Sequence, residues 1–230
     1  MADFLTSLPM FSLVLTFCAF QVGAWCQKKT GSAIFNPILV GSILVIGVLL
    51  ITGIDPEVYD KGTQGISWLL TPATVCLALP LYQQIKILKS DLPAILAGII
   101  AGTVTSIVCV FFMCKLFRLN YELTVSLLPK SITTAIGAVL SSQNGGNPTV
   151  TSVVIIITGV FGNLIGSAFA KILKLKDPVS QGVAFGTSSH LGGTAKANEL
   201  HPITGAVSTL SLVVAGILVA VLFPIVCQFL

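Results

Sequence analysis

Polar residues within apolar stretches are the places where this sequence can do chemistry, and the longest such group is TSSHLGGTAK at 187–196. A broken helix frees backbone N–H groups, and a helix N-terminus carries partial positive charge, so this segment suits an anion. We expect it to bind a small carboxylate substrate through Thr187, Ser188, Ser189, His190 and Thr194, with Gly192 and Gly193 breaking the helix. His190 can also carry a coupling proton, because an unperturbed imidazole has a pKa of about 6.5. The alternative is structural: the hydroxyls bond their own helix, and His190 bonds a neighbouring carbonyl.

A second polar group follows Pro129 and consists of Lys130, Ser131, Thr133 and Thr134. A cation beside three hydroxyls predicts a second part of the same anion site. The alternative is that Lys130 extends its long side chain from a helix end to the membrane–water interface.

A third group lies in the apolar segment 71–82, where two prolines accompany two threonines. Proline removes an N–H donor and clashes with the preceding turn, so Pro72 and Pro80 predict a broken helix. The freed carbonyls, together with Thr71 and Thr74, can hold an ion or the substrate. A span that is only kinked is the alternative.

Enzymatic and metal chemistry find no support in the sequence. The six cysteines form no CxxC pair or Cys/His cluster, which favours packing over metal binding. Nucleophile-elbow, zinc-protease, Walker and dinucleotide motifs are absent, and the eight Asp and Glu residues mostly flank apolar stretches. We therefore expect no enzyme, no metal and no cofactor, apart from a coupling proton or sodium ion.

The elements that must position these residues are membrane helices. Of 230 residues, 54% are hydrophobic and 9% are charged, against about 25% charged in soluble domains. This composition excludes a soluble enzyme and a nucleic-acid binder. Charge-free gaps of 23 to 25 residues, each long enough to cross a bilayer, occur at 4–27, 30–54, 62–85 and 92–114.

Two later regions complete the predicted topology. The gap at 131–170 is split by the turn sequence QNGGNP, and a strong span covers about 203–229. Between them, 178–199 is too polar to face lipid, which predicts a broken or re-entrant element inside the protein. The fold class is thus an all-α polytopic membrane protein, with about seven to eight transmembrane or re-entrant helices.

The stretches 36–118 and 147–229 share an order of landmarks, each opening with Asn-Pro and continuing to Asp-Pro. This order predicts two structural repeats with broken helices, a pattern typical of secondary transporters, within a single domain over 1–230. Shared membrane composition is the alternative. Lys28 and Lys29 favour an outside N-terminus, and the lysines of 171–176 favour a cytoplasmic loop.

The chain resembles the LrgB/CidB family in an ordered set of motifs from about Asn36 onward. These motifs are TPAT with LPLY at 71–82, PKSITT at 129–134, GG at 145–146, KDP at 176–178, and GTSSH with GTA at 186–195. Two positions depart from the family pattern and leave the ligand's identity open. Ala135 stands where many relatives have Pro, and Leu191-Gly192 replaces a more usual small or aliphatic pair.

The resemblance implies two functions in the bacterial cytoplasmic membrane. The first is secondary transport of small monocarboxylates such as pyruvate or glycolate, since members are implicated in pyruvate uptake and in plastidal glycolate/glycerate exchange. The alternative is an antiholin-like regulator of murein hydrolase export and autolysis without transport activity. In either case, the resemblance implies a smaller LrgA/CidA-type membrane partner, and we expect a homo-oligomer.

Overall fold

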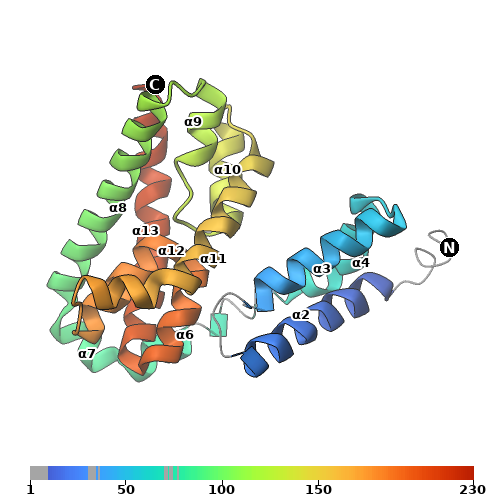
Figure 1. The fold of residues 1–230 in the computed structure, drawn as a ribbon. Helices are drawn as coiled ribbons and strands as arrows, with labels where there is room; N and C mark the ends of the chain where they lie inside the picture. Colours follow the sequence, from blue (N-terminus) through green and yellow to red (C-terminus); the bar gives the residue numbers. More distant parts are fainter. Residues whose placement is uncertain (1–9, 31–34, 36, 70–71, 73–74, 77) are drawn as a thin grey trace. The chain divides into compact units, whose positions relative to one another are not determined.

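The computed structural model describes residues 10–30, 35, 37–69, 72, 75–76 and 78–230. All of its regular elements are helices, as the all-α prediction requires (Figure 1). The chain forms two compact units, Met1–Ala78 and Leu79–Leu230. Thr71 and Thr74 lie outside the described residues. Pro72 is exposed, and Pro80 lies within the short helix α6 (Ala78–Gln83).

The first unit contains three helices: α2 (Phe11–Thr30), α3 (Pro37–Thr52) and α4 (Pro56–Trp68). Helix α2 packs against both α3 and α4. Gly62 lets α4 approach α2, because a Cβ there would collide with the Ser12 hydroxyl. One turn further along α2, the Thr16 hydroxyl lies 2.7 Å from the hydroxyl of Tyr59 on α4.

The second unit holds α7 (Ile85–Ser90), α8 (Leu92–Leu116), α9 (Tyr121–Leu127), α10 (Thr134–Gln143), α11 (Pro148–Ile172), α12 (Pro178–Leu200) and α13 (Pro202–Cys227). Among the described residues, α8, α11 and α13 are long and apolar enough to cross a membrane, and α3 is a shorter apolar helix. The fold is therefore helical with three clear candidate spans. The larger predicted number of elements and the repeats 36–118 and 147–229 remain predictions.

Capping side chains followed by proline begin three of these helices, because proline fits the first helical position, where its missing N–H costs nothing. Asn147 accepts hydrogen bonds from the backbone of Thr149 and Val150, at 3.0 and 3.3 Å. Asp177 accepts from the Ser180 backbone N–H at 2.7 Å. This bond, followed by a second one from the Ser180 hydroxyl, lowers the pKa of the Asp177 carboxyl.

Helices α9 and α10 form a hairpin. The hydroxyl of Tyr121, at the start of α9, donates to the Asn144 carbonyl just beyond the end of α10. At the opposite end of the hairpin, a Cβ on Gly137 would lie 3.5 Å from the Pro129 carbonyl. The start of α9 and the end of α10 therefore lie at the same end of the hairpin, and the tip at its other end is the non-helical stretch 128–133.

Helix α12 is also a hairpin, because the chain reverses at two non-helical residues. Ser189 has φ −137° and His190 has φ 39°, ψ −130°. A Cβ on Gly193 would lie 2.5 Å from the carbonyl oxygen of Phe185, whereas eight residues of straight helix would separate these positions by about 12 Å. The predicted break is therefore present, and α12 consists of a first arm (178–188) and a second arm (191–200).

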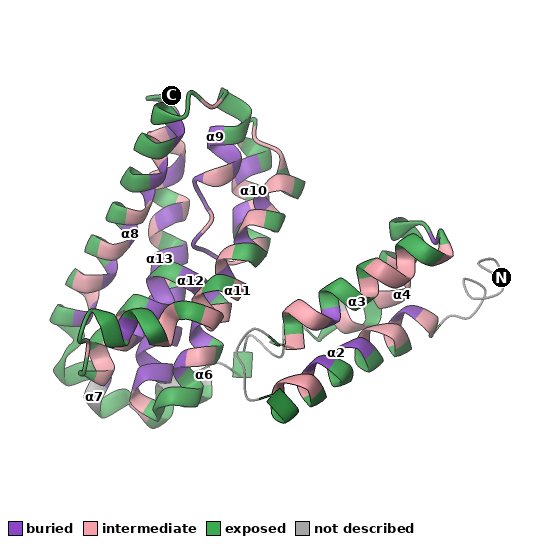
Figure 2. Ribbon diagram, viewed as in Figure 1, coloured by how far each residue is buried: buried purple, intermediate pink, exposed green. Residues whose placement is uncertain are grey.

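Two apolar clusters lie against α8 and α13, and many buried residues lie along α12 and α13 (Figure 2). One cluster joins the C-terminal halves of α8 and α13 to α9 and includes Ile107, Val125 and Phe223. The other joins the N-terminal half of α8 to α13 and includes Ile99 and Val207. This packing holds both hairpins against a common scaffold.

Candidate functional site

A pocket of about 780 Å³ lies among α8, α11, the first arm of α12 and the tip of the α9–α10 hairpin. Most of its wall is apolar and comes from residues such as Phe161, Ile165 and Phe169. Its polar side chains lie on both hairpins, on α8 and on α11: Thr105, Ser106, Lys130, Thr158, Gln181, Thr187, Ser188 and Ser189. A site that buries a small polar ligand has this mixture of apolar walls and a few polar groups.

Lys130 is the only charged residue among those that line this pocket. Its ammonium donates to the Ser131 hydroxyl at 3.1 Å, and that hydroxyl lies 3.0 Å from the Ser106 hydroxyl on α8. In the part of the chain that the structure describes, the single ion pair joins Lys196 to Glu199, so no described carboxylate neutralises Lys130. A cation in an apolar pocket favours an occupant that carries negative charge.

The hydroxyls of the first arm of α12 are partly used by their own helix. Thr187 donates to the Val183 carbonyl at 2.8 Å, and Ser188 donates to the Ala184 carbonyl at 2.7 Å. The Ser188 and Ser189 hydroxyls lie 3.0 Å apart at the end of the arm. Because Ser188 has one proton and gives it to the Ala184 carbonyl, Ser189 is the donor in this contact, and both oxygens keep acceptor capacity.

His190 holds the turn of the hairpin and does not line the pocket. It is buried, and its Nε2 lies 2.8 Å from the Ile155 carbonyl on α11. This contact matches the structural alternative that the sequence left open. Thr194 is also buried away from the pocket, where its hydroxyl lies 2.9 Å from that of Ser208 on α13.

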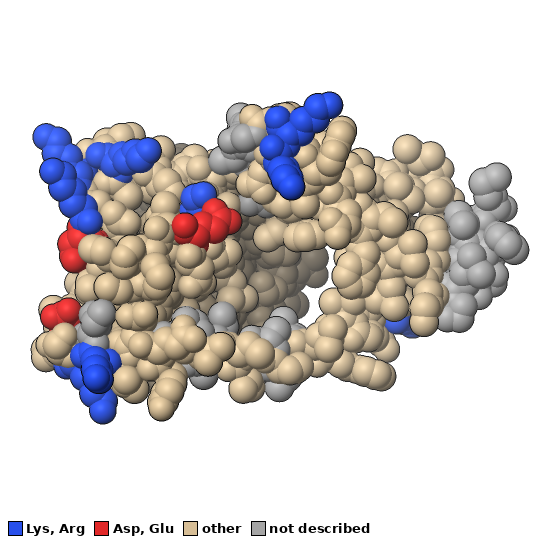
Figure 3. Space-filling view, turned by 90° about the horizontal axis from the view of Figure 1, so that it is seen from below, with Lys and Arg blue, Asp and Glu red and all other residues tan. Residues whose placement is uncertain are grey.

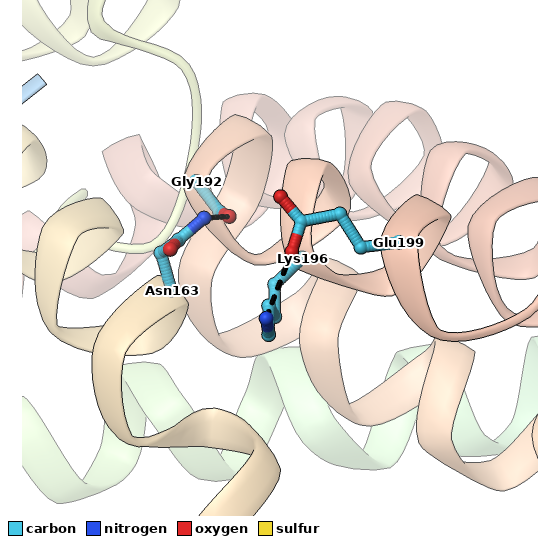
Figure 4. Close-up of polar contacts among 4 residues, drawn as sticks. All are labelled: Asn163, Gly192, Lys196 and Glu199. Atoms are coloured by element: carbon cyan, nitrogen blue, oxygen red, sulfur yellow. Dashed lines mark hydrogen bonds and ion pairs between the residues drawn. The ribbon is translucent and has the colours of Figure 1, made fainter. Parts of the chain in front are cut away.

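Gly192 and Gly193 lie in the second arm, two and three residues past the dihedral break at Ser189–His190. Their role in the structure is close packing: a Cβ on Gly192 would collide with the backbone of Gly159 on α11. Asn163 of α11 donates to the Gly192 carbonyl at 3.2 Å, and the Lys196–Glu199 pair lies one turn further along the arm (Figure 4).

The structure thus brings together only part of the predicted set. Lys130, Thr187, Ser188 and Ser189 line the pocket, and Ser131 adjoins it. Thr133 and Thr134 lie half-buried at the start of α10 and are not among the lining residues.

Ser106 and Asn163 were not among the predicted site residues, yet Ser106 lines the pocket and Asn163 braces the α12 hairpin. Their only signal in the sequence is a polar side chain inside an otherwise apolar span. A smaller cavity beside the pocket touches Thr103, whose buried hydroxyl has no hydrogen-bond partner among the described residues. No group of three or more His, Cys, Asp or Glu suited to a metal occurs in the described ranges.

Comparison with known proteins gives a consistent result. The profile of the LrgB-like family matches residues 16–229. Holin-like protein CidB of Staphylococcus epidermidis is 37% identical over 213 residues, covering 93% of each chain. Antiholin-like protein LrgB of Bacillus subtilis is 35% identical over 224 residues, covering 97% of each. Holin-like protein CidB of Staphylococcus aureus is 34% identical over 225 residues, covering 98% of this chain and 97% of that protein. No solved structure matches the chain.

Proposed function

The chain belongs to the LrgB-like family and is a protein of the bacterial cell membrane, and on this premise we propose that it acts as a holin/antiholin-like regulator of cell lysis. The observation that carries this proposal is similarity along almost the whole chain to proteins named holin-like or antiholin-like. In this proposal the protein tunes murein hydrolase export and autolysis beside a smaller LrgA/CidA-type membrane partner. One domain over 1–230, assembled as a homo-oligomer, is part of the same proposal.

The test is autolysis in a bacterium that lacks its own members of this family. Cells expressing the chain, alone and with a partner of the LrgA/CidA type, should lyse at a rate different from vector controls. Zymograms of secreted murein hydrolases should change in parallel. An unchanged lysis rate and unchanged zymograms, with the protein present in the membrane, would refute the proposal.

A second candidate, transport of small monocarboxylates, is favoured by the pocket. Its one charged side chain is cationic, and its walls are apolar except for hydroxyls, as a small organic monoanion would require. Lys130 would neutralise the carboxylate, and the Ser188 and Ser189 hydroxyls would rotate away from their present acceptors, the Ala184 carbonyl and Ser188, to donate to its oxygens. A coupling proton or sodium ion would accompany the substrate.

Proteoliposomes loaded with the purified protein test this candidate with labelled pyruvate, glycolate and lactate. Uptake of at least one of them, with or without a pH gradient, is the expected result. Lys130→Gln should reduce that uptake at least tenfold, whereas Lys115→Gln, which changes a charge outside the pocket, should not. Absence of uptake of all three by the wild-type protein removes the transport candidate and leaves the lysis proposal standing.

A further inference from the structure

We propose that residues 117–147 and 173–201 form two re-entrant hairpins that approach the Lys130 pocket from opposite sides of the membrane. Each hairpin then controls access to the pocket from its own side. This inference goes beyond the proposed function, because it holds whether the pocket serves transport or senses a ligand.

The directions of the three candidate spans fix the orientation of both hairpins. The first arm of α12 runs parallel to α8 and α13 and antiparallel to α11. Helices α8 and α13 therefore run in one direction, and α11 runs in the opposite direction. The contacts that show this are Gly98–Val183, Gly102–Thr187, Gly182–Val207, Gly186–Ser211, Gly166–Phe185 and Gly162–Ser189. The chain from α8 to α11 must therefore return to the side on which α8 ends. The chain from α11 to α13 must return to the opposite side.

Both hairpins stop near the middle of a neighbouring span. Ser131, at the tip of the α9–α10 hairpin, bonds Ser106, which is the fifteenth of the 25 residues of α8. Ser189, at the tip of α12, meets Gly162, which is the fifteenth of the 25 residues of α11. Irregular backbone at this depth is tolerated only inside the protein or beside a polar cavity, and here the cavity is the pocket itself.

The connections into the two hairpins are built alike, residue for residue. Arg118 after α8 and Lys174 after α11 have φ of 52° and 54°. In both connections, three successive backbone N–H groups donate to carbonyls that lie four, three and five residues earlier in the chain. The donor–acceptor distances are 2.9 to 3.1 Å. The sequences KLFRL at 115–119 and KILKL at 171–175 carry this pattern.

A capping residue then starts each hairpin, Asn120 in one and Asp177 in the other. Two helix-plus-hairpin units of the same design, running in opposite directions, form an inverted repeat of the kind on which many secondary transporters are built. Their bounds, about 92–143 and 148–200, differ from those of the repeat that the sequence predicts.

Charge assigns the two sides. The ends at which α8 begins and α11 finishes carry six lysines: Lys86, Lys89, Lys171, Lys174, Lys176 and Lys196. At the opposite ends, where α8 finishes and α11 begins, the described basic residues are Lys115 and Arg118. Figure 3 views the molecule from the lysine-rich end. Because cytoplasmic loops are rich in Lys and Arg, the α12 hairpin opens to the cytoplasm and the α9–α10 hairpin opens to the outside.

Single cysteines in an otherwise cysteine-free chain test the topology in whole cells. Glu122→Cys and Gln143→Cys should react with a membrane-impermeant maleimide in intact cells. Lys176→Cys and Glu199→Cys should react only after permeabilisation. All four side chains are exposed, so access to reagent depends on the membrane alone. If Glu122→Cys and Gln143→Cys, or Lys176→Cys and Glu199→Cys, react from different sides, the hairpin concerned crosses the membrane and the proposal is overturned.

A disulfide lock tests the control of access. The pair Ser106→Cys/Ser131→Cys, whose hydroxyls lie 3.0 Å apart, should crosslink the α9–α10 tip to α8 on oxidation. Ser188→Cys, which lines the pocket, should react with the impermeant reagent from both sides in the reduced protein. After oxidation, its labelling from outside should fall at least tenfold while labelling from the cytoplasm persists. Unchanged labelling from outside in the locked protein, or labelling from one side only in the reduced protein, would overturn the proposal.

Discussion

Replacing Gly192 by Ala should separate α12 from α11. The added Cβ would collide with the carbonyl of Gly159, whereas ordinary contact needs about 3.4 Å, so the two backbones must move apart by about 1 Å. Neither atom can rotate away, because the collision is with backbone and not with the end of a flexible side chain. The movement also weakens the hydrogen bond from Asn163 to the Gly192 carbonyl.

The expected cost follows from these contacts. Overpacking of a close-packed interior costs about 1–3 kcal/mol, and a lost hydrogen bond costs about 1 kcal/mol more. The better helix propensity of Ala returns at most about 1 kcal/mol. We therefore expect a net loss of about 1–3 kcal/mol, equivalent to a fall in Tm of roughly 3–10 °C for a chain of this length.

Thermal unfolding of the purified protein in detergent measures this change. Gly216→Ala is the matched control, since a Cβ there meets only Ile136 Cδ1 at an ordinary 3.5 Å, and its Tm should stay the same or rise. A Tm for Gly192→Ala equal to or above that of Gly216→Ala would refute the close approach of α11 and α12.

Three further predictions concern other contacts in the second unit. Asp177→Ala should destabilise the protein by about 0.5–2 kcal/mol at neutral pH. The folded pKa of Asp177 lies below its unfolded value of about 3.9. The penalty should therefore be constant above a pH of about 3.9 and shrink as the pH falls through the folded pKa. A penalty that grows on acidification contradicts this prediction. Thr151→Val removes the hydroxyl that lies 2.8 Å from the Ser141 hydroxyl and 2.9 Å from the Ser126 carbonyl. It should lower the free energy of unfolding by about 1–3 kcal/mol in denaturation assays. Thr149→Val, at an exposed position, should lower it little. Thr194→Val should lower the Tm without altering binding or uptake of a monocarboxylate, because Thr194 packs against Ser208 outside the pocket; lost binding at unchanged Tm would move Thr194 into the site.

The sequence predicts the break in α12 because a polar, glycine-containing segment cannot face lipid. It does not place the break at Ser189 and His190, because that position depends on the Ile155 carbonyl, 35 residues away, which holds the imidazole. Glycine residues that suggest breakage instead allow close packing of α12 on α11. Local pattern cannot distinguish the two roles, since both favour glycine.

The pocket was partly predictable for a similar reason. Lys130 and Ser188 stand out because each is polar in an apolar context. Ser106 does not stand out, since a serine within a span commonly bonds its own helix, and only the Ser131 contact shows otherwise. The Asp-Pro sequence at 177–178 is one landmark of the predicted repeat. In the structure it is the capped start of α12.

If the pocket serves the proposed regulation of lysis, its one cation, Lys130, should be required, and the lysis assay with Lys130→Gln tests this requirement directly. Wild-type protein, Lys130→Gln and Lys115→Gln would be expressed at equal membrane levels in the same family-deficient host, and autolysis would be followed by turbidity. We predict that the change in lysis rate produced by the wild type is retained by Lys115→Gln and reduced to the vector level in Lys130→Gln. A Lys130→Gln strain that lyses at the wild-type rate would contradict the claim that this pocket carries the function.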